Sequence, residues 1–266
     1  MKGKLRFFFK FPYLGLGKIL YLQFILLKLF PKRSFPLMSL VPQAMEYFNV
    51  STEEDFKKQY AIRQKKAHEL WDSHPRNTPA EIAAFYDEHD ADIWRQAALS
   101  AGWEGDRSYM YKKKLLFAYH IARKIGAKNI LDYGCGASAA GNYLAKKGFV
   151  VSAADIPSQT LEFVARTHPF KKVFTIRPDL QLEDSYDYIM CLDALEHTTT
   201  PVEITEFFLK SLKTGGYLFV TFPIEKDLQN RRPSHTLEAQ LQRPATFEYL
   251  RSICTEVVPE MIYKKL

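Results

Sequence analysis

Cysteine is scarce in this 266-residue chain, and the few cysteines present stand far apart. Cys135, Cys191 and Cys254 form no CxxC pair, and no histidine stands near them at the spacing of a zinc site. Disulfide frameworks and zinc modules need closely spaced ligands, so neither is indicated. The sequence therefore predicts a reducing, cytoplasmic setting and no metal site.

Acidic side chains are absent from residues 1–35, and the first one in the chain is Glu46. The net charge of +7 comes from 37 Lys and Arg against 30 Asp and Glu. Without the N-terminal stretch, 29 cations face 30 acids, so the rest of the chain is nearly neutral. This balance argues against a nucleic-acid-binding core. The cations of the stretch are Lys2, Lys4, Arg6, Lys10, Lys18, Lys28, Lys32 and Arg33.

An apolar run long enough to span a bilayer is also lacking. Leu14–Phe30 would form about 25 Å of helix against roughly 30 Å of hydrocarbon, and it contains Lys18 and Lys28. No small-residue cleavage site follows the run, which disfavours a cleaved signal peptide. We expect residues 1–40 to be a basic-apolar segment that adsorbs through residues 1–35 to the inner face of a membrane. The alternatives are that this segment packs on its own core or on a partner subunit, or that it spans the membrane.

Residues 41–108 predict a helical cap. A charged helix is expected over residues 51–75, where Ser51 and Glu54 have the spacing of a capping box. A second helix is expected from Thr78 to Leu99, with a proline at its first position.

Two aromatic residues of the second helix share one face. Tyr86 and Trp94 are eight residues apart, which brings them to the same side of a helix. Such a face either packs into the core or forms a lid over a substrate. Both alternatives remain open from the sequence.

Residues 109–266 begin with a third expected helix over Tyr109–Ile125, and the hydrophobic pattern changes after it. Short apolar runs then alternate with helical stretches, which indicates βαβ units and a parallel sheet. We predict an α/β fold with a doubly wound, mostly parallel, Rossmann-like sheet and the helical cap at its N-terminal side. After an expected helix over Ala245–Cys254, residues 255–266 are expected to form one further strand. The other expected strands are Asn129–Asp132, Val150–Asp155, Val173–Ile176, Tyr188–Leu192 and Tyr217–Phe222.

A glycine-rich turn follows the first of these strands. Gly134 and Gly136 allow a ligand to approach the backbone closely, but their GxGxxA spacing also fits a dinucleotide fingerprint. Asp132 stands two residues earlier, where a carboxylate would attract an amino group and repel a pyrophosphate. Asp155 ends the next strand, where an acid can accept hydrogen bonds from both hydroxyls of a ribose. The alternative for Asp155 is a solvated acid at a strand end.

A third block makes the pattern more specific. It runs from Tyr186 through Asp193 to Leu195-Glu196-His197, and a glycine pair before the strand at Tyr217 follows a helix. The three blocks together resemble the class I S-adenosylmethionine-dependent methyltransferases over about residues 110–225. The Leu-Glu-His ending resembles the branch that includes the ubiquinone-biosynthesis O-methyltransferases.

The resemblance implies S-adenosylmethionine as the cofactor and assigns its contacts. Asp132, Gly134 and Gly136 would hold the methionine portion, Asp155 the ribose, and Ile156 would lie against the adenine. Further contacts are implied at Asp193 and Leu195, where the fourth strand meets the cofactor, and at Asp179 for the adenine amino group.

The reaction itself requires few protein groups, because the sulfonium is already activated. An oxygen acceptor must still lose a proton, and His197 has the pKa range of a general base; it could equally be a helix-start histidine bonded to the backbone. His235 is a second candidate. The acceptor would be a small molecule or a lipid-linked compound. Alternative functions are a nicotinamide-dependent oxidoreductase and a non-catalytic, membrane-associated binding protein.

Overall fold

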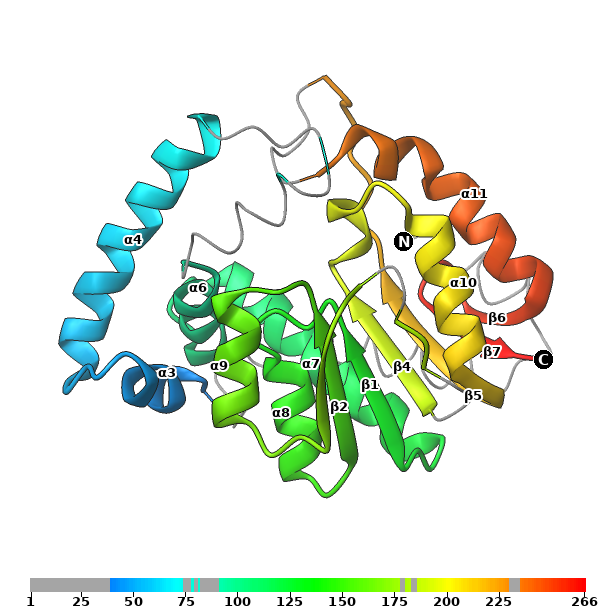
Figure 1. The fold of residues 1–266 in the computed structure, drawn as a ribbon, viewed down its shortest axis with the longest axis horizontal. Coiled ribbons are helices and arrows are strands. Elements are labelled where there is room, and N and C mark those ends of the chain that lie inside the picture. Colours follow the sequence, from blue (N-terminus) through cyan, green and yellow to red (C-terminus); the bar gives the residue numbers. More distant parts are fainter. Residues whose placement is uncertain are drawn as a thin grey trace, which may run out of the picture.

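The computed structural model describes residues 39–73, 78, 81, 91–177, 180–182, 186–229 and 235–266. Within these residues the chain forms one seven-stranded sheet with helices on both faces (Figure 1). The strands are β1 (Asn129–Tyr133), β2 (Val150–Asp155), β3 (Lys172–Thr175), β4 (Tyr186–Leu192), β5 (Leu212–Thr221), β6 (Cys254–Val258) and β7 (Ile262–Lys265). The helices are α3 (Val41–Tyr47), α4 (Glu53–Ser73), α6 (Ala91–Ala101), α7 (Asp106–Lys124), α8 (Ala139–Lys146), α9 (Gln159–Thr167), α10 (Pro201–Ser211) and α11 (Leu237–Ile253), with the 3-10 turn η1 (Leu195–His197).

The sheet has the order β3-β2-β1-β4-β5-β7-β6, in which the first five strands are parallel and β7 and β6 are antiparallel to their neighbours. The chain enters the sheet in the middle at β1, runs outward through β2 to β3 at one edge, returns to β4 beside β1, and continues through β5 to the other edge. The predicted doubly wound, mostly parallel α/β fold is confirmed. In this topology the carboxyl ends of β1 and β4 are adjacent at the switch point, where ligands bind in such sheets.

Side chains of the central strands alternate between two cores. On β1, Ile130 belongs to the core beneath α7, α8 and α9, whereas Leu131 belongs to the core beneath α10 and α11. The same alternation recurs on β4, where Met190 and Ile189 face opposite sides. Burial on both faces explains why these strands are continuous apolar runs.

The C-terminal prediction was wrong in one respect. Two short strands, β6 and β7, follow α11, where one was expected. They fit because the turn between them is tight: Glu260 adopts a left-handed φ of 52°, and Met261 N donates to Val258 O at 3.1 Å. The helix before them begins at Leu237 and continues through Pro244, so it is longer than the predicted segment from Ala245.

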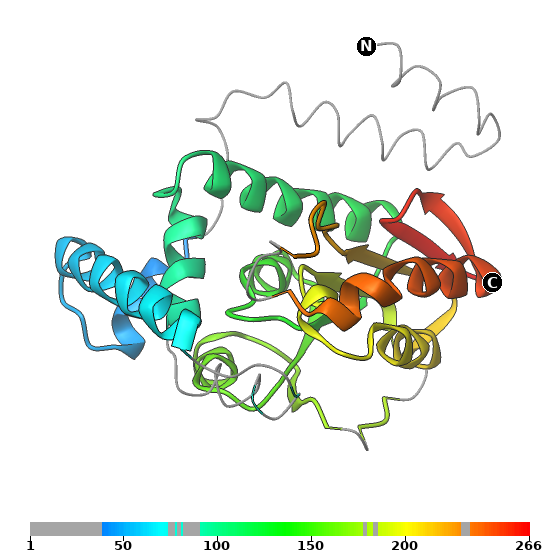
Figure 2. The same ribbon diagram turned by 90° about the horizontal axis from the view of Figure 1, so that it is seen from above.

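The cap consists of α3, α4 and α6, which pack against the hydrophobic core next to α7 and α9 (Figures 1 and 2). Trp94 of α6 is fully buried there, stacked on Phe56 at 4.0 Å and Phe48 at 4.6 Å between ring centroids. The guanidinium of Arg63 lies 4.5 Å from the Trp94 ring. Trp94 is therefore a core residue of the cap, which is the first of the two alternatives that the sequence left open, and it is not an exposed residue of a substrate lid. Tyr86, the other predicted lid residue, lies outside the described residues.

The domain boundaries at residues 40 and 108 stay predictions. The start of α7 at Asp106 lies close to the second boundary. The predicted surface anchor in residues 1–35 falls outside the part of the chain that the structure describes. In the described part, no helix combines the length and the apolar character that crossing a membrane requires.

The cap of α4 lies one residue later than the sequence predicted. Asp55 N donates to Thr52 Oγ1 at 3.1 Å, and Thr52 Oγ1 donates to Asp55 Oδ2 at 2.7 Å. We expect Thr52→Ala to lower the free energy of unfolding by about 1 kcal/mol, because a backbone N–H of the first turn loses its acceptor. Urea denaturation measures this, with Ser51→Ala as the matched control. A loss with Ser51→Ala and none with Thr52→Ala would restore the predicted cap.

Candidate functional site

The glycine-rich turn between β1 and α8 lies at the carboxyl end of the sheet. Gly134 and Gly136 have φ angles of 63° and 50°, and Ser138 has 48°, so the turn is built from left-handed backbone. A Cβ added to Gly134 would lie 2.4 Å from Ala194 Cβ, because the ends of β1 and β4 approach closely there. A Cβ on Gly136 would lie 2.1 Å from Gln96 Nε2. Close approach therefore requires glycine at position 134, and the left-handed φ favours it at position 136.

Asp132 holds this turn from inside. Its side chain is 4% exposed, and its Oδ2 accepts from Ser138 Oγ at 2.6 Å and from Gly141 N at 3.3 Å. Burial raises the pKa of the carboxyl to about 7, although both hydrogen bonds act in the opposite direction. The predicted contact of Asp132 with the amino group of a cofactor stays a prediction, since the described bonds of this carboxylate run to the turn itself.

Asp155, at the end of β2, lies against the other side of the turn. Its Oδ2 accepts from Gly136 N at 2.6 Å, and its Oδ1 accepts from Ile156 N at 2.8 Å. Burial raises the pKa of this carboxyl to about 6, while the two backbone N–H groups lower it. The carboxylate is thus held at the edge of the glycine turn, next to Ile156, and the ribose and adenine contacts of these two residues stay predictions.

Asp193 follows β4 in a left-handed conformation with φ 54°. Thr221 Oγ1 donates to its Oδ1 at 2.7 Å, and Lys114 of α7 forms an ion pair with its Oδ2. Leu195, two residues on, is buried in the core under α10 and α11. The structure therefore places Asp193 beside the turn and directs Leu195 into the protein.

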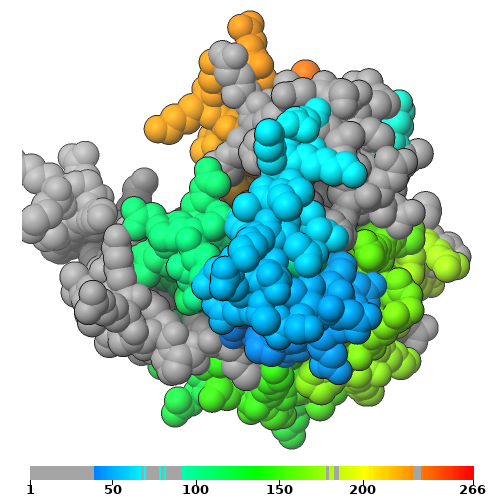
Figure 3. Space-filling model, turned by 90° about the vertical axis from the view of Figure 1, so that its left-hand side faces the viewer, coloured from blue at the N-terminus to red at the C-terminus, as the bar shows by residue number. Residues whose placement is uncertain are grey.

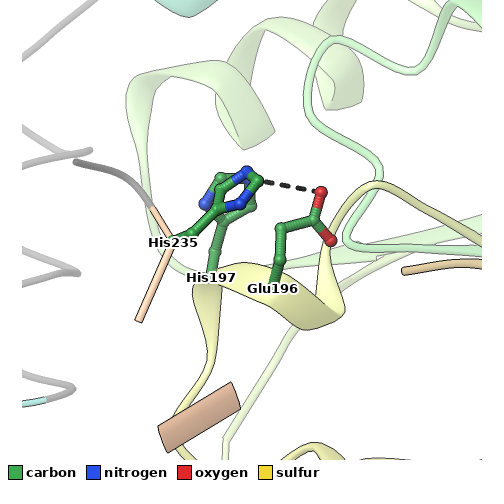
Figure 4. A group of neighbouring side chains, drawn as sticks. All are labelled: Glu196, His197 and His235. Atoms are coloured by element: carbon green, nitrogen blue, oxygen red, sulfur yellow. Dashed lines mark ion pairs between the residues drawn. The ribbon is translucent and has the colours of Figure 1, made fainter. Parts of the chain in front are cut away.

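The two predicted histidines lie together just beyond this point (Figure 4). The rings of His197 and His235 make an edge contact with centroids 5.3 Å apart. His197 Nε2 is 3.9 Å from Glu196 Oε1, and His235 Nδ1 is 2.6 Å from Glu225 Oε1. His235 is 3% exposed, whereas His197 retains 27% of its side-chain surface. We name Glu196, His197, Glu225 and His235 the histidine cluster.

The comparisons with known proteins agree with this geometry. The family model described as "Methyltransferase domain" matches residues 103–253, more than half of the chain. The chain belongs to this methyltransferase family. Class I methyltransferases of this kind use S-adenosylmethionine, which is the cofactor of this chain. Nothing in the matches supports the nicotinamide alternative.

Curated relatives of this methyltransferase carry the name "Ubiquinone biosynthesis O-methyltransferase". The protein of Idiomarina loihiensis is 29% identical over 155 residues, which cover 53% of this chain and 59% of the relative. That of Xylella fastidiosa is 30% identical over 139 residues, covering 47% and 56%. The chain thus spans somewhat more than half of the length of these two relatives.

Solved methyltransferases resemble the fold at low identity. The N-methyltransferase NodS from Bradyrhizobium japonicum is 16% identical with a TM-score of 0.44, and the match covers 58% of this chain and 96% of NodS. A S-adenosylmethionine-dependent methyltransferase from Methanosarcina mazei is 18% identical with a TM-score of 0.40, covering 52% and 92%.

The residues present fit the cofactor. S-adenosylmethionine has two positive groups, a carboxylate and a ribose diol. The site offers a glycine turn (the glycine cradle) bordered by the carboxyl groups of Asp155 and Asp193, with the buried Asp132 beneath it. A carboxylate-rich rim suits a cationic ligand and opposes a pyrophosphate. Asp179, the predicted adenine contact, lies outside the described residues.

Three features of the site escaped the sequence analysis. Gln96 reaches the glycine turn from α6, and Glu225 pairs with His235, yet neither stands in a motif. The donor atoms of Glu196, His197 and His235 lie within 4.8 Å of one another, a spacing that a cation could share, although no metal site was predicted. These features form only in the folded structure, so no pattern in the sequence could have identified them.

Proposed function

We propose that this methyltransferase transfers a methyl group from S-adenosylmethionine to a hydroxyl oxygen of a small or lipid-linked acceptor. The observation that carries the proposal is the position of the histidine cluster, which lies at the same end of the sheet as the glycine cradle and Asp193. The O-methyltransferase names of the curated relatives support an oxygen acceptor.

The cofactor supplies an activated methyl group on a positively charged sulfur. His197, partly exposed beyond the end of β4, accepts the proton of the acceptor hydroxyl as the new oxygen–carbon bond forms. His235 packs against the His197 ring, and Glu225 holds His235 Nδ1. These contacts fix the direction of the His197 side chain, so the acceptor oxygen and the receiving nitrogen meet in one orientation.

Apolar side chains near the histidine cluster support an acceptor with an apolar part. Ile224 and Leu241 are 65% and 62% exposed on either side of His235 in the sequence, and Leu237 is 37% exposed. The segment after β5, orange in Figure 3, stands out from the molecular surface. These exposed apolar side chains, together with the basic and apolar composition of residues 1–35, support a membrane-associated acceptor.

Thermal unfolding tests the proposed function first. We expect S-adenosylmethionine and S-adenosylhomocysteine each to raise the unfolding midpoint by several degrees, because a ligand of the folded state stabilises it. NADH, the control, leaves the midpoint unchanged. Formation of S-adenosylhomocysteine with membrane lipid or cytosolic metabolite fractions then identifies the acceptor class. Folded protein that neither cofactor stabilises contradicts the proposal.

A further inference from the structure

The cap contacts the cofactor cradle through one side chain. Gln96 Oε1 accepts from Ala137 N at 3.1 Å, directly after Gly136, and from Tyr111 OH at 3.2 Å. Its Nε2 donates to Asp92 Oδ2, one helical turn earlier, at 2.8 Å. Gln96 and Asp92 lie on α6, which precedes the segment matched by the family model. The cap therefore adds its own polar groups to the family site.

The orientation of the Gln96 amide follows from its neighbours. Ala137 N can only donate, so the atom facing it is the oxygen, and Nε2 carries the two N–H groups. One of them is used by Asp92; the other has no acceptor among the residues that the structure describes, and Nε2 is close above Gly136. One turn of α6 thus offers an N–H donor and a carboxylate side by side over the cradle.

The opposite side of Ala137 is also held. His168 Nε2 donates to Ala137 O at 2.9 Å, and burial lowers the pKa of His168 to about 4, which keeps the ring neutral. Ala137 is therefore fixed at both its N–H and its carbonyl, and the position of Gln96 relative to the cradle is well defined. Gln96 is not a loosely placed surface side chain.

Gln96 and Asp92 lie next to Gly136 and are close to carboxyl groups on both sides of the turn, since the charge of Asp92 also raises the pKa of Asp155 at the end of β2. Tyr111, which bonds Gln96, has its pKa raised by burial and by the charges of Asp92, Asp132 and Asp193. The chemistry of the pair, rather than its side of the sheet, therefore decides which end of the cofactor it suits.

We propose that Gln96 and Asp92 bind the amino-acid end of S-adenosylmethionine, with the Gln96 amide donating to its carboxylate and the Asp92 carboxylate accepting from its ammonium. A zwitterion needs one donor and one anion at neighbouring positions, which is the pair that this turn of α6 presents. The inference rests on the proposed function, because it concerns the same cofactor site.

Binding of three ligands to the full-length chain tests this by titration calorimetry. S-adenosylmethionine and S-adenosylhomocysteine contain the zwitterion, whereas 5′-methylthioadenosine shares the nucleoside and lacks it. In Asp92→Asn we expect affinity for the first two to fall by about tenfold, as for a lost charge-assisted bond, and affinity for methylthioadenosine to stay unchanged. Gln96→Glu, which keeps an oxygen for Ala137 N but replaces the donor by an anion, gives the same pattern. Glu54→Gln, an exposed acid-to-amide change on α4, alters none of the three affinities.

An equal fall in affinity for all three ligands overturns the inference. Gln96 and Asp92 would then only shape the glycine turn and would not bind the amino-acid end. Unchanged affinity for S-adenosylmethionine in both variants also overturns it. Failure of the wild-type chain to bind S-adenosylmethionine is a separate result, and it contradicts the proposed function itself.

Discussion

His197→Ala is expected to lower the rate of S-adenosylhomocysteine formation by roughly 10²–10⁴-fold, the range in which a general base contributes. The side chain is partly exposed beside the cradle, and the contact with His235 holds its ring in place. Affinity for S-adenosylmethionine should not change, because none of the cradle bonds involves His197. The rate is measured with the extract fraction that supports turnover of the wild type, and the affinity by calorimetry.

His120→Ala is the matched control for this experiment. His120 lies on α7, remote in the fold from the histidine cluster, and we expect it to leave turnover unchanged. Full turnover of His197→Ala would contradict the general-base role. Loss of wild-type turnover after a chelator would instead assign Glu196, His197 and His235 to a metal ion.

Asp155→Ala is expected to weaken S-adenosylmethionine binding by roughly tenfold or more, because the ribose loses an ionised acceptor. The carboxyl has its pKa raised by burial to about 6, so wild-type affinity should also fall as the pH drops through about 6. In Asp155→Asn, which keeps an oxygen for Gly136 N, that pH dependence should be reduced. Titration calorimetry between pH 5 and pH 8 measures both effects.

The raised pKa of Asp155 also makes the free energy of unfolding depend on pH. The folded-state pKa of Asp155 is raised above its usual value of 3.8, so its stabilising contribution is complete below about pH 4 and is lost as the pH rises through about 6. Asp187→Asn, at the opposite end of the sheet, is the control: it should change stability and leave affinity unchanged. Equal affinity in wild type and Asp155→Ala would remove Asp155 from the ribose site.

Most of the sheet could be predicted because its signal is local. The strands β1, β2 and β4 are apolar runs that end at or next to an acid or a glycine, and β5 follows a glycine pair. The structure has each of these strands within a few residues of the predicted bounds, except for the earlier start of β5. One strand was predicted where β6 and β7 are present. The pair depends on a tight turn at Glu260, which the residue types there do not predict. The N-cap of α4 is Thr52 instead of Ser51, which is the usual uncertainty of one residue at helix ends.

The site shows the same division. Asp155, Asp193 and His197 could be predicted as site residues because each ends or follows a strand, and parallel strands align their carboxyl ends. Trp94 was left with two readings, since helical spacing shows a shared face and not its partner; packing against Phe56 decided for the core.

By itself the sequence determined the fold class, the glycine cradle, the cofactor and the family, because these depend on motifs carried by consecutive residues. The tertiary structure decided which distant side chains meet: Gln96 over Ala137, Lys114 beside Asp193, and Glu225 behind His235. Such contacts join residues 10 or more positions apart only after the chain has folded, so packing geometry, rather than spacing along the chain, brings them together.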